Sequence, residues 1–359
     1  MQLVSSRVRI FFAFGIALAM SLGNAGLAVA DSNIIDPSSA YQAADHLTSL
    51  DPTGYDVHGD LVAVYASQHL RLYNRNSWQL ISDLGDAGYT TSATYNSFVK
   101  FDPSGESVWV GYTVGGNVND RIYQVTGLDS APAWNHVATL ASNYELAFSG
   151  GAAYVSGPNS TIFGADNAIW QLDTSGNNNH TLIASVGGFA AGIAFDATGN
   201  LYYGTNLGTD DRLVTFSAAQ VAEGGKSLFD AATLSDIPHP ASDVEVDSAG
   251  HVLFTTNNVD LYWNQLGSTL GMWNGTSGSG ANYEVIGEAG VNHWYNAVRA
   301  IGDVTAGGTA YLDDGGAWGS PIMGLAEINP TPAPEPSTLV LVLCGLAALA
   351  WQRRRSRRS

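Results

Sequence analysis

The chain of 359 residues has a single cysteine, Cys344, which lies in an apolar run near the C-terminus. The rest of the chain therefore forms no internal disulfide, and its stability has to come from packing and backbone pairing. Basic residues are scarce as well: between Asp31 and Ala333 there are seven, against 31 acidic residues, a formal charge of −24. A surface this acidic repels nucleic acid and attracts cations, so nucleic-acid binding is excluded.

Familiar catalytic motifs are also missing from the sequence. It has no H-E-x-x-H zinc motif, no G-x-S-x-G nucleophile elbow and no EF-hand calcium loop, and its eight histidines never pair at metal-ligand spacing. Gly225, Lys226 and Ser227 resemble the end of a phosphate-binding loop, but Gln220 stands where that loop has its first glycine. We therefore predict no catalytic residue, and an enzymatic role is less expected than a binding role.

The N-terminus has the pattern of an export signal. Arg7 and Arg9 precede an apolar stretch over residues 10–22, and Ala28 and Ala30 form an A-x-A cleavage site before Asp31. This order is typical of a secretory signal peptide. We predict that residues 1–30 are a signal peptide and that the rest of the chain is exported.

The C-terminus contains a second targeting pattern. Alternate prolines over residues 330–336 favour a stiff, extended spacer that ends in Pro334, Glu335 and Pro336. An apolar run of 15 residues (337–351) follows, which is short for a membrane span of about 20 helical residues. Five arginines between positions 353 and 358 would stay cytoplasmic, which places everything before the run outside.

This order of Pro-Glu-Pro, apolar run and arginine cluster resembles the PEP-CTERM sorting signal of bacterial envelope proteins. The resemblance implies that residues 337–359 form a hydrophobic helix with an Arg-rich tail, held briefly in the inner membrane. It further implies cleavage by an exosortase-type processing enzyme and a final location in the cell envelope or outside the cell. Expected partners are exopolysaccharide or other envelope proteins. The alternative is an ordinary C-terminal anchor that is never cut.

Residues 31–329 contain a repeated unit. In the clearest copy, residues 192–203 form a strand, an Asp-x-x-Gly turn and a second strand, and residues 212–216 form a third. Turn glycines recur at 59, 105, 150, 199, 250 and 308, and this spacing of 45 to 58 residues is typical of propeller blades. The copy at 192–216 resembles an NHL-type blade.

The sixth copy lacks a fourth strand, because the chain turns into proline soon after Ile328. Residues 45–50 match the fourth strand at 135–140 and are predicted to complete the last blade, which would close the ring and remove two open edges. The expected fold is thus all-β, a six-bladed β-propeller over residues 31–329 closed by an N-terminal strand. Seven blades are the alternative.

Polar side chains stand where the chain enters the inner strands of the predicted blades. Asn96, Glu145, Asp243 and Asn296 would converge at the mouth of the channel, where carboxylate and amide oxygens could bind Ca²⁺ or a polar ligand. The alternative is that Asn, Asp and Gly simply favour loops.

Two classes of function agree with these patterns. The first is a non-enzymatic cell-surface or extracellular-matrix protein whose propeller binds other molecules or serves as a scaffold. The second is a secreted, metal-dependent propeller hydrolase or lactonase, in which a metal at the channel mouth activates water or a carbonyl. The missing catalytic motifs favour the first class.

Overall fold

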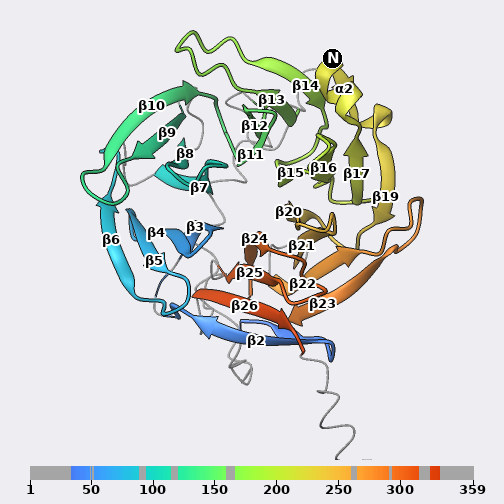
Figure 1. Cartoon of the computed structure of the whole chain (residues 1–359). Coiled ribbons are helices and arrows are strands. Elements are labelled where there is room, and N and C mark those ends of the chain that lie inside the picture. Colours follow the sequence, from blue (N-terminus) through green and yellow to red (C-terminus); the bar gives the residue numbers. More distant parts are fainter. Residues whose placement is uncertain are drawn as a thin grey trace, which may run out of the picture. The chain divides into compact units, whose positions relative to one another are not determined.

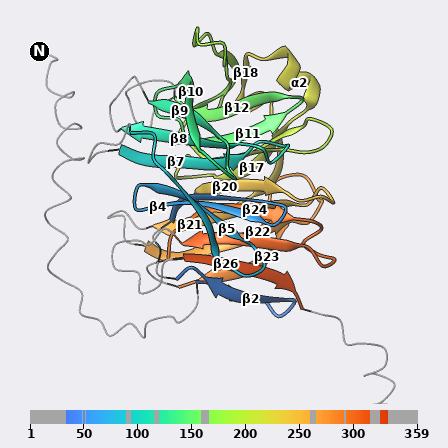
Figure 2. The same ribbon diagram turned by 60° about the vertical axis from the view of Figure 1, so that its left-hand side comes forward.

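The computed structural model describes residues 34–48, 50, 52–88, 94–114, 120–158, 166–259, 265–290, 293–314 and 324–331. These residues form six mainly antiparallel sheets arranged as blades around a common centre (Figures 1 and 2). The six-bladed propeller is therefore confirmed, and the seven-bladed alternative is not.

Each blade starts at the centre of the ring and adds its later strands outward (Figure 1). The first two blades are β3 (Pro52–His58), β4 (Leu61–Ala66), β5 (His69–Asn74) and β6 (Leu80–Gly85), then β7 (Thr94–Phe101), β8 (Val108–Val114), β9 (Arg121–Thr126) and β10 (Ala133–Thr139).

The third and fourth blades are joined by a short helical insertion. The third has β11 (Glu145–Ser149), β12 (Ala152–Gly157), β13 (Ala168–Gln171) and β14 (Thr181–Ser185), with β18 (Lys226–Ser227) parallel to β14. The fourth has β15 (Ile193–Phe195), β16 (Leu201–Gly204), β17 (Arg212–Phe216) and β19 (Ala232–Asp236). The helix α2 (Ala218–Glu223) and the 3-10 turn η2 (Leu228–Asp230) lie between β17 and β19 in the sequence.

The last two blades take strands from both halves of the chain. The fifth has β20 (Ala241–Val246), β21 (Val252–Val259), β22 (Gln265–Trp273) and β23 (Tyr283–Ala289), with β1 (Asp36–Pro37) on its outer edge. The sixth has β24 (Tyr295–Ile301), β25 (Thr309–Asp314), β26 (Gly324–Pro330) and, as its outer strand, β2 (Tyr41–His46).

The N-terminal closure is confirmed, but the closing strand lies earlier than predicted. β2 pairs antiparallel with β26, from Tyr41 opposite Pro330 to His46 opposite Leu325. Leu47 has a φ of +53°, and the N–H of Leu50 donates to the carbonyl of Leu47, so the chain turns here and cannot continue as a strand. The prediction of a strand over residues 45–50 is therefore wrong in its bounds.

The turn glycines are largely where the repeat places them. Gly105, Gly199 and Gly250 have φ between +74° and +88°, a conformation that residues with a Cβ rarely adopt. In the sixth blade the positive φ of +96° belongs to Gly307 rather than to the predicted Gly308. The repeat therefore located this turn to within one residue.

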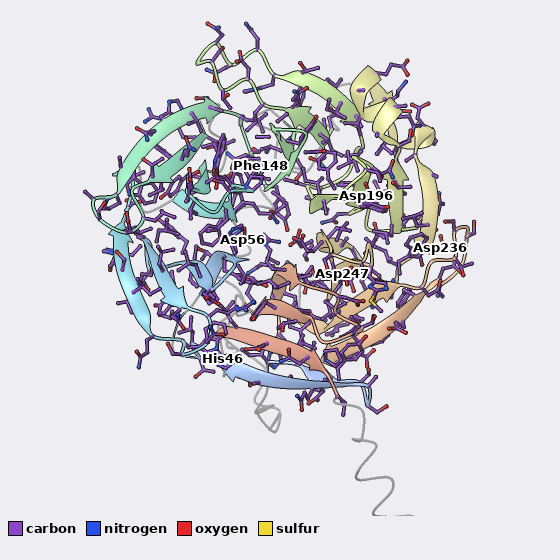
Figure 3. All side chains as sticks on the ribbon, in the orientation of Figure 1. His46, Asp56, Phe148, Asp196, Asp236 and Asp247 are labelled. Carbon is purple, nitrogen blue, oxygen red and sulfur yellow. The ribbon has the colours of Figure 1, made fainter. Side chains whose placement is uncertain are left out.

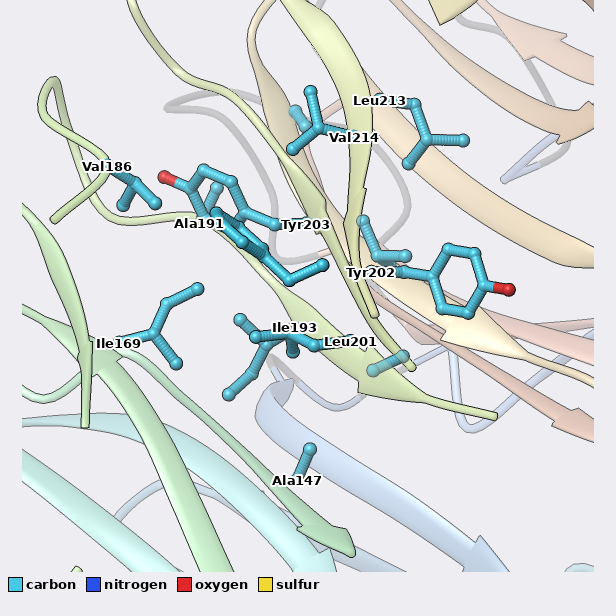
Figure 4. Packing of buried hydrophobic residues seen from close by; sticks show 14 of the residues in the cluster. Ala147, Ile169, Val186, Ala191, Ile193, Leu201, Tyr202, Tyr203, Leu213 and Val214 are labelled. Atoms are coloured by element: carbon cyan, nitrogen blue, oxygen red, sulfur yellow. The ribbon is translucent and has the colours of Figure 1, made fainter. Parts of the chain in front are cut away.

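The core lies between neighbouring blades and takes side chains from their inner, middle and outer strands. Six aromatic residues of the second strands are at most 9% exposed: Trp109, Tyr154, Tyr202, Tyr203, Phe254 and Tyr311. Figure 4 shows Tyr203 beside Val186 and Ala191 in the largest cluster. Burial of such large side chains between sheets is the main stabilising contribution in a domain without disulfides.

The predicted targeting segments fall outside the described residues. They are the cleavage site at Ala28 and Ala30, the motif Pro334, Glu335 and Pro336, and the helix predicted within 337–359. Among the residues that the structure describes, no helix is both long and apolar enough to span a membrane. The signal peptide and the sorting signal stay predictions.

Candidate functional site

The inner strands bring a cluster of charged side chains to the centre of the ring. Five of the six inner strands each contribute at least one charged residue to this cluster. Figure 3 shows Asp56 near the centre of the ring. The members of this central cluster are Asp56 on β3, Lys100 on β7, Glu145 on β11, Asp243 and Glu245 on β20, and Arg299 on β24.

Arg299 is the hub of the central cluster. Its Nη1 donates to Oδ2 of Asp243 at 2.5 Å and its Nη2 donates to Oε1 of Glu145 at 3.1 Å. Its Nε lies 3.1 Å from Oδ1 of Asp56, a close ionic contact whose angle is too bent for a hydrogen bond. The side chain of Arg299 is only 3% exposed, so one guanidinium joins its own blade to three others out of contact with bulk water.

Lys100 adds a second cation to the cluster. Its Nζ donates to Oε2 of Glu245 at 3.0 Å and lies 4.0 Å from Oε1 of Glu145. Four carboxylates thus face two cations, which leaves a formal charge of −2 when all are ionised.

Burial shifts the protonation of these carboxylates. It raises the pKa of Glu145 to about 8, against the opposing effect of Arg299, and nearby Asp243 raises it further. Burial likewise raises the pKa of Asp56 and of Asp243, again in spite of the two cations. The cluster therefore holds protons at a pH at which exposed carboxylates have lost theirs.

Of the four predicted ligand residues, two meet in this cluster. Glu145 and Asp243 both bind Arg299. Asn296 lies next to them, but its backbone N–H donates to Oδ1 of Asp313 at 3.2 Å. Asn96 lies on β7 opposite Tyr112, and its side chain is outside the described residues. A calcium ion at Glu145 and Asp243 would have to share their oxygens with a guanidinium, whose charge opposes it.

The sequence interpretation missed the cations of this site. Arg299 and Lys100 are two of the seven basic residues between Asp31 and Ala333, and both stand within inner strands between apolar neighbours. A charged residue in the interior of a buried strand requires an ionic partner, and that was the available signal.

A pocket opens beside the central cluster, at the ends where the inner strands begin. Its volume is about 470 Å³, and Glu145 and Arg299 line one side of it. The remaining lining is neutral, with hydroxyls, amides and aromatic rings contributed by Ser97, Thr113, Asn143, Tyr144, Asn167, Phe189 and Asn296. Pockets with a few convergent polar groups in a mostly apolar wall are the usual form of small-molecule sites.

Not all of these polar groups are available to a ligand. Asn143 donates through Nδ2 to the carbonyls of Tyr112 and Leu140 and accepts from Ser97 through Oδ1. Its side chain is fully used in holding the wall together. Asn167 is different: its Nδ2 donates to the hydroxyl of Tyr203 at 2.9 Å, but its Oδ1 has no hydrogen-bond partner among the described residues.

A second cluster lies at the far ends of β20 and β24, away from the pocket. Asp247, His251 and Asp303 each offer a ligand atom, and these atoms lie within 4.8 Å of one another. Oδ2 of Asp247 also accepts from the backbone N–H of Val304 at 2.9 Å, so the same carboxylate ties the turns of two blades together. This triad could hold a metal ion, and the spacing of histidines in the sequence did not reveal it.

Comparison with known proteins identifies the fold and no closer relationship. No protein-family model and no curated protein matches the chain. A luciferin-regenerating enzyme matches with a TM-score of 0.53 at 10% identity, over 80% of this chain and 95% of that one. A calcium-binding protein, regucalcin, from Agrobacterium tumefaciens matches with 0.52 at 11%, over 80% and 90%. A gluconolactonase from Xanthomonas campestris matches with 0.51 at 12%, over 86% and 99%. Identities this low establish a shared six-bladed propeller and nothing of the chemistry.

Proposed function

We propose that the chain is an exported protein of the cell envelope whose propeller binds a small polar ligand in the pocket and catalyses no reaction on it. One observation carries this proposal. The charged groups at the centre of the channel bind each other, through Arg299 and Lys100, and the rest of the pocket offers neutral hydroxyls, amides and aromatic rings. Such a surface recognises a ligand but supplies no activated nucleophile.

The targeting patterns support a place in the envelope. A signal peptide over residues 1–30 and a sorting signal from Pro334 onward would deliver the propeller to the outer face of the inner membrane. Its partners there would be an exosortase-type enzyme during maturation, and exopolysaccharide or other envelope proteins afterwards. The charge of −24 between Asp31 and Ala333 opposes non-specific adhesion to anionic lipid.

A metal-dependent lactonase or hydrolase is the second candidate. The observation that favours it is Glu145, which lines the pocket and has its pKa raised by burial to about 8, a value suited to acid–base catalysis near neutral pH. A calcium ion beside Glu145 and Asp243 would supply the Lewis acid for such a reaction. The fold of a calcium-binding protein and of a gluconolactonase allows this role without arguing for it.

A calcium titration followed by thermal melting separates these functions, because an ion bound only by the folded state raises the melting temperature. Wild type is compared with Glu145→Gln, which changes the pocket, and with Asp303→Asn, which changes the triad. A calcium-dependent shift that only Glu145→Gln abolishes locates the ion in the pocket. A shift that only Asp303→Asn abolishes locates it in the triad and leaves the pocket to another ligand.

Hydrolysis of sugar lactones is measured with the same three proteins, with and without calcium. The proposal expects no turnover above the uncatalysed rate in any of them. Calcium-dependent hydrolysis that Glu145→Gln removes would overturn it in favour of the enzyme.

A further inference from the structure

The carbonyl oxygen of the Asn167 side chain is the most unusual polar atom of the pocket. Asn167 is 1% exposed and lines the pocket, yet its Oδ1 has no hydrogen-bond partner among the described residues. An amide oxygen that is buried without a partner costs free energy, and native proteins rarely leave one so. Because Oδ1 itself is buried in the wall, a ligand that donates a hydrogen bond to it has to part the side chains at this point of the pocket.

The orientation of this oxygen is set by its neighbours. Nδ2 of Asn167 donates to the hydroxyl of Tyr203 at 2.9 Å, and that hydroxyl donates its own proton to the carbonyl of Phe189 at 3.4 Å. Because the single proton of Tyr203 is used in this way, Asn167 has to present its N–H to Tyr203 and its oxygen elsewhere. The backbone is fixed as well, since the N–H groups of Val186 and Gly187 both donate to the carbonyl of Asn167.

The groups around this oxygen define the chemistry of the ligand. Phe189 stands at the wall of the pocket with 38% of its surface exposed, which provides an apolar face for a ring to lie on. Burial raises the pKa of Tyr144 far above its usual range, so its hydroxyl keeps its proton and can donate. The two charged residues that line the pocket, Glu145 and Arg299, bind each other, so neither is left as a counterion for a charged ligand.

We propose that the pocket binds a neutral, hydroxyl-rich ring compound, a sugar unit, with Asn167 Oδ1 accepting a hydroxyl proton and Phe189 packing against the ring. This inference rests on the proposed function and names the class of ligand for the same site. Asn167 acts here as a specificity residue that contacts the ligand, and Tyr203 acts as a positioning residue that orients it.

The test is isothermal titration calorimetry on the protein recovered from its host. The probes are trisaccharides of glucose, galactose and N-acetylglucosamine, with galacturonate and glucuronate oligomers as anionic counterparts. Binding of at least one neutral probe is expected, with weaker binding of the anionic ones.

Asn167→Leu should lower the affinity for the neutral probe about tenfold or more, because it removes the acceptor while keeping a similar volume. Phe189→Ala should also weaken binding, whereas Phe229→Ala, at a position 98% exposed and outside the pocket, should leave it unchanged.

Thermal melting without ligand distinguishes this role from a structural one. If Asn167 only supported the fold, Asn167→Leu would lower the melting temperature and leave the affinity of the folded protein intact, which would overturn the inference. Binding of the uronates or of calcium alone would also overturn it while leaving the pocket a ligand site. The absence of binding by every sugar probe would overturn the inference, while the calcium titration and the lactone assay decide the proposed function separately.

Discussion

At the scale of single residues, Arg299 is the side chain on which the centre of the ring depends. Replacing it by methionine removes the cation that Asp56, Glu145 and Asp243 share and leaves their charges buried. Loss of one partner from a buried ion network typically costs about 3–5 kcal/mol of unfolding free energy. We therefore expect Arg299→Met to lower that free energy by about this amount in urea unfolding at pH 7.5.

Arg212→Met is the matched control for this change. Arg212 pairs with Asp236 at 3.8 Å, and both side chains are about half exposed. Water screens such a pair, so its loss should change the unfolding free energy by no more than about 0.5 kcal/mol. Equal effects of the two substitutions would show that the buried network is not what stabilises the centre.

Glu145 should make the stability of the propeller depend on pH. Burial raises its pKa from 4.5 to about 8, so between these values the folded protein holds a proton that the unfolded chain releases. Stability is then fully present below about pH 4.5 and is lost as the pH rises through about 8. The charged groups that contact or surround the Glu145 carboxyl are Asp56, Lys100, Asp243 and Arg299.

The measurement is the melting temperature of wild type and Glu145→Gln from pH 5.5 to 8.5. Wild type should lose several degrees over this range, on the order of 2–4 °C per kcal/mol for a domain this large. Glutamine stays neutral and should flatten the slope. A wild-type melting temperature that rises with pH would contradict the expectation.

At the scale of secondary-structure elements, β2 is the strand that closes the ring. It covers the edge of β26 over six residue pairs, from Tyr41 to His46. The segment before it is also anchored, because Ile34 is fully buried and its carbonyl accepts from the hydroxyl of Tyr295 at 2.9 Å. A chain that begins at Leu47 would expose β26 as an unpaired edge, and we expect it to aggregate on size-exclusion chromatography.

The control for this truncation is a chain that begins at Ser32, which keeps Ile34, β1 and β2. It should elute as the untruncated propeller does and melt at the same temperature. If the chain beginning at Leu47 were equally monomeric and equally stable, β2 would not be needed for closure.

The sequence predicts those elements that local interactions form, and it predicts less well those that depend on pairing between distant residues. The third strand β17 was predicted with its observed bounds, because alternation and the Asp-x-x-Gly turn are local signals. The start of β2 was missed by four residues, since its pairing with β26 joins positions almost 290 residues apart. The meeting of Glu145 and Asp243 was predicted from their place before inner strands. The presence of their partner Arg299 in the same cluster was not predicted, because ion pairs between blades leave no local sequence pattern.

At the scale of the whole molecule, the last described residue lies beside the start of the strand that closes the ring. The described structure ends at Thr331, whose N–H donates to the carbonyl of Ala40, directly before β2. The proline-rich spacer therefore begins beside the closing strand. A membrane segment that follows it would be connected to the blade whose outer strand comes from the N-terminus.

Processing at the sorting signal is the prediction that concerns the complete chain. Because Pro334, Glu335 and Pro336 directly precede the apolar run, we expect an exosortase-type enzyme to remove the segment after about Pro336. The signal peptide should be absent as well, with Asp31 as the first residue. Intact-mass analysis of the protein recovered from its host measures both ends at once. A mass that includes Arg358 would rule out cleavage and identify an ordinary membrane anchor.

Replacing Glu335 by alanine provides the control, because it leaves the apolar run and the arginines in place. An uncut product of this variant that stays in the membrane would show that the processing enzyme recognises the motif itself.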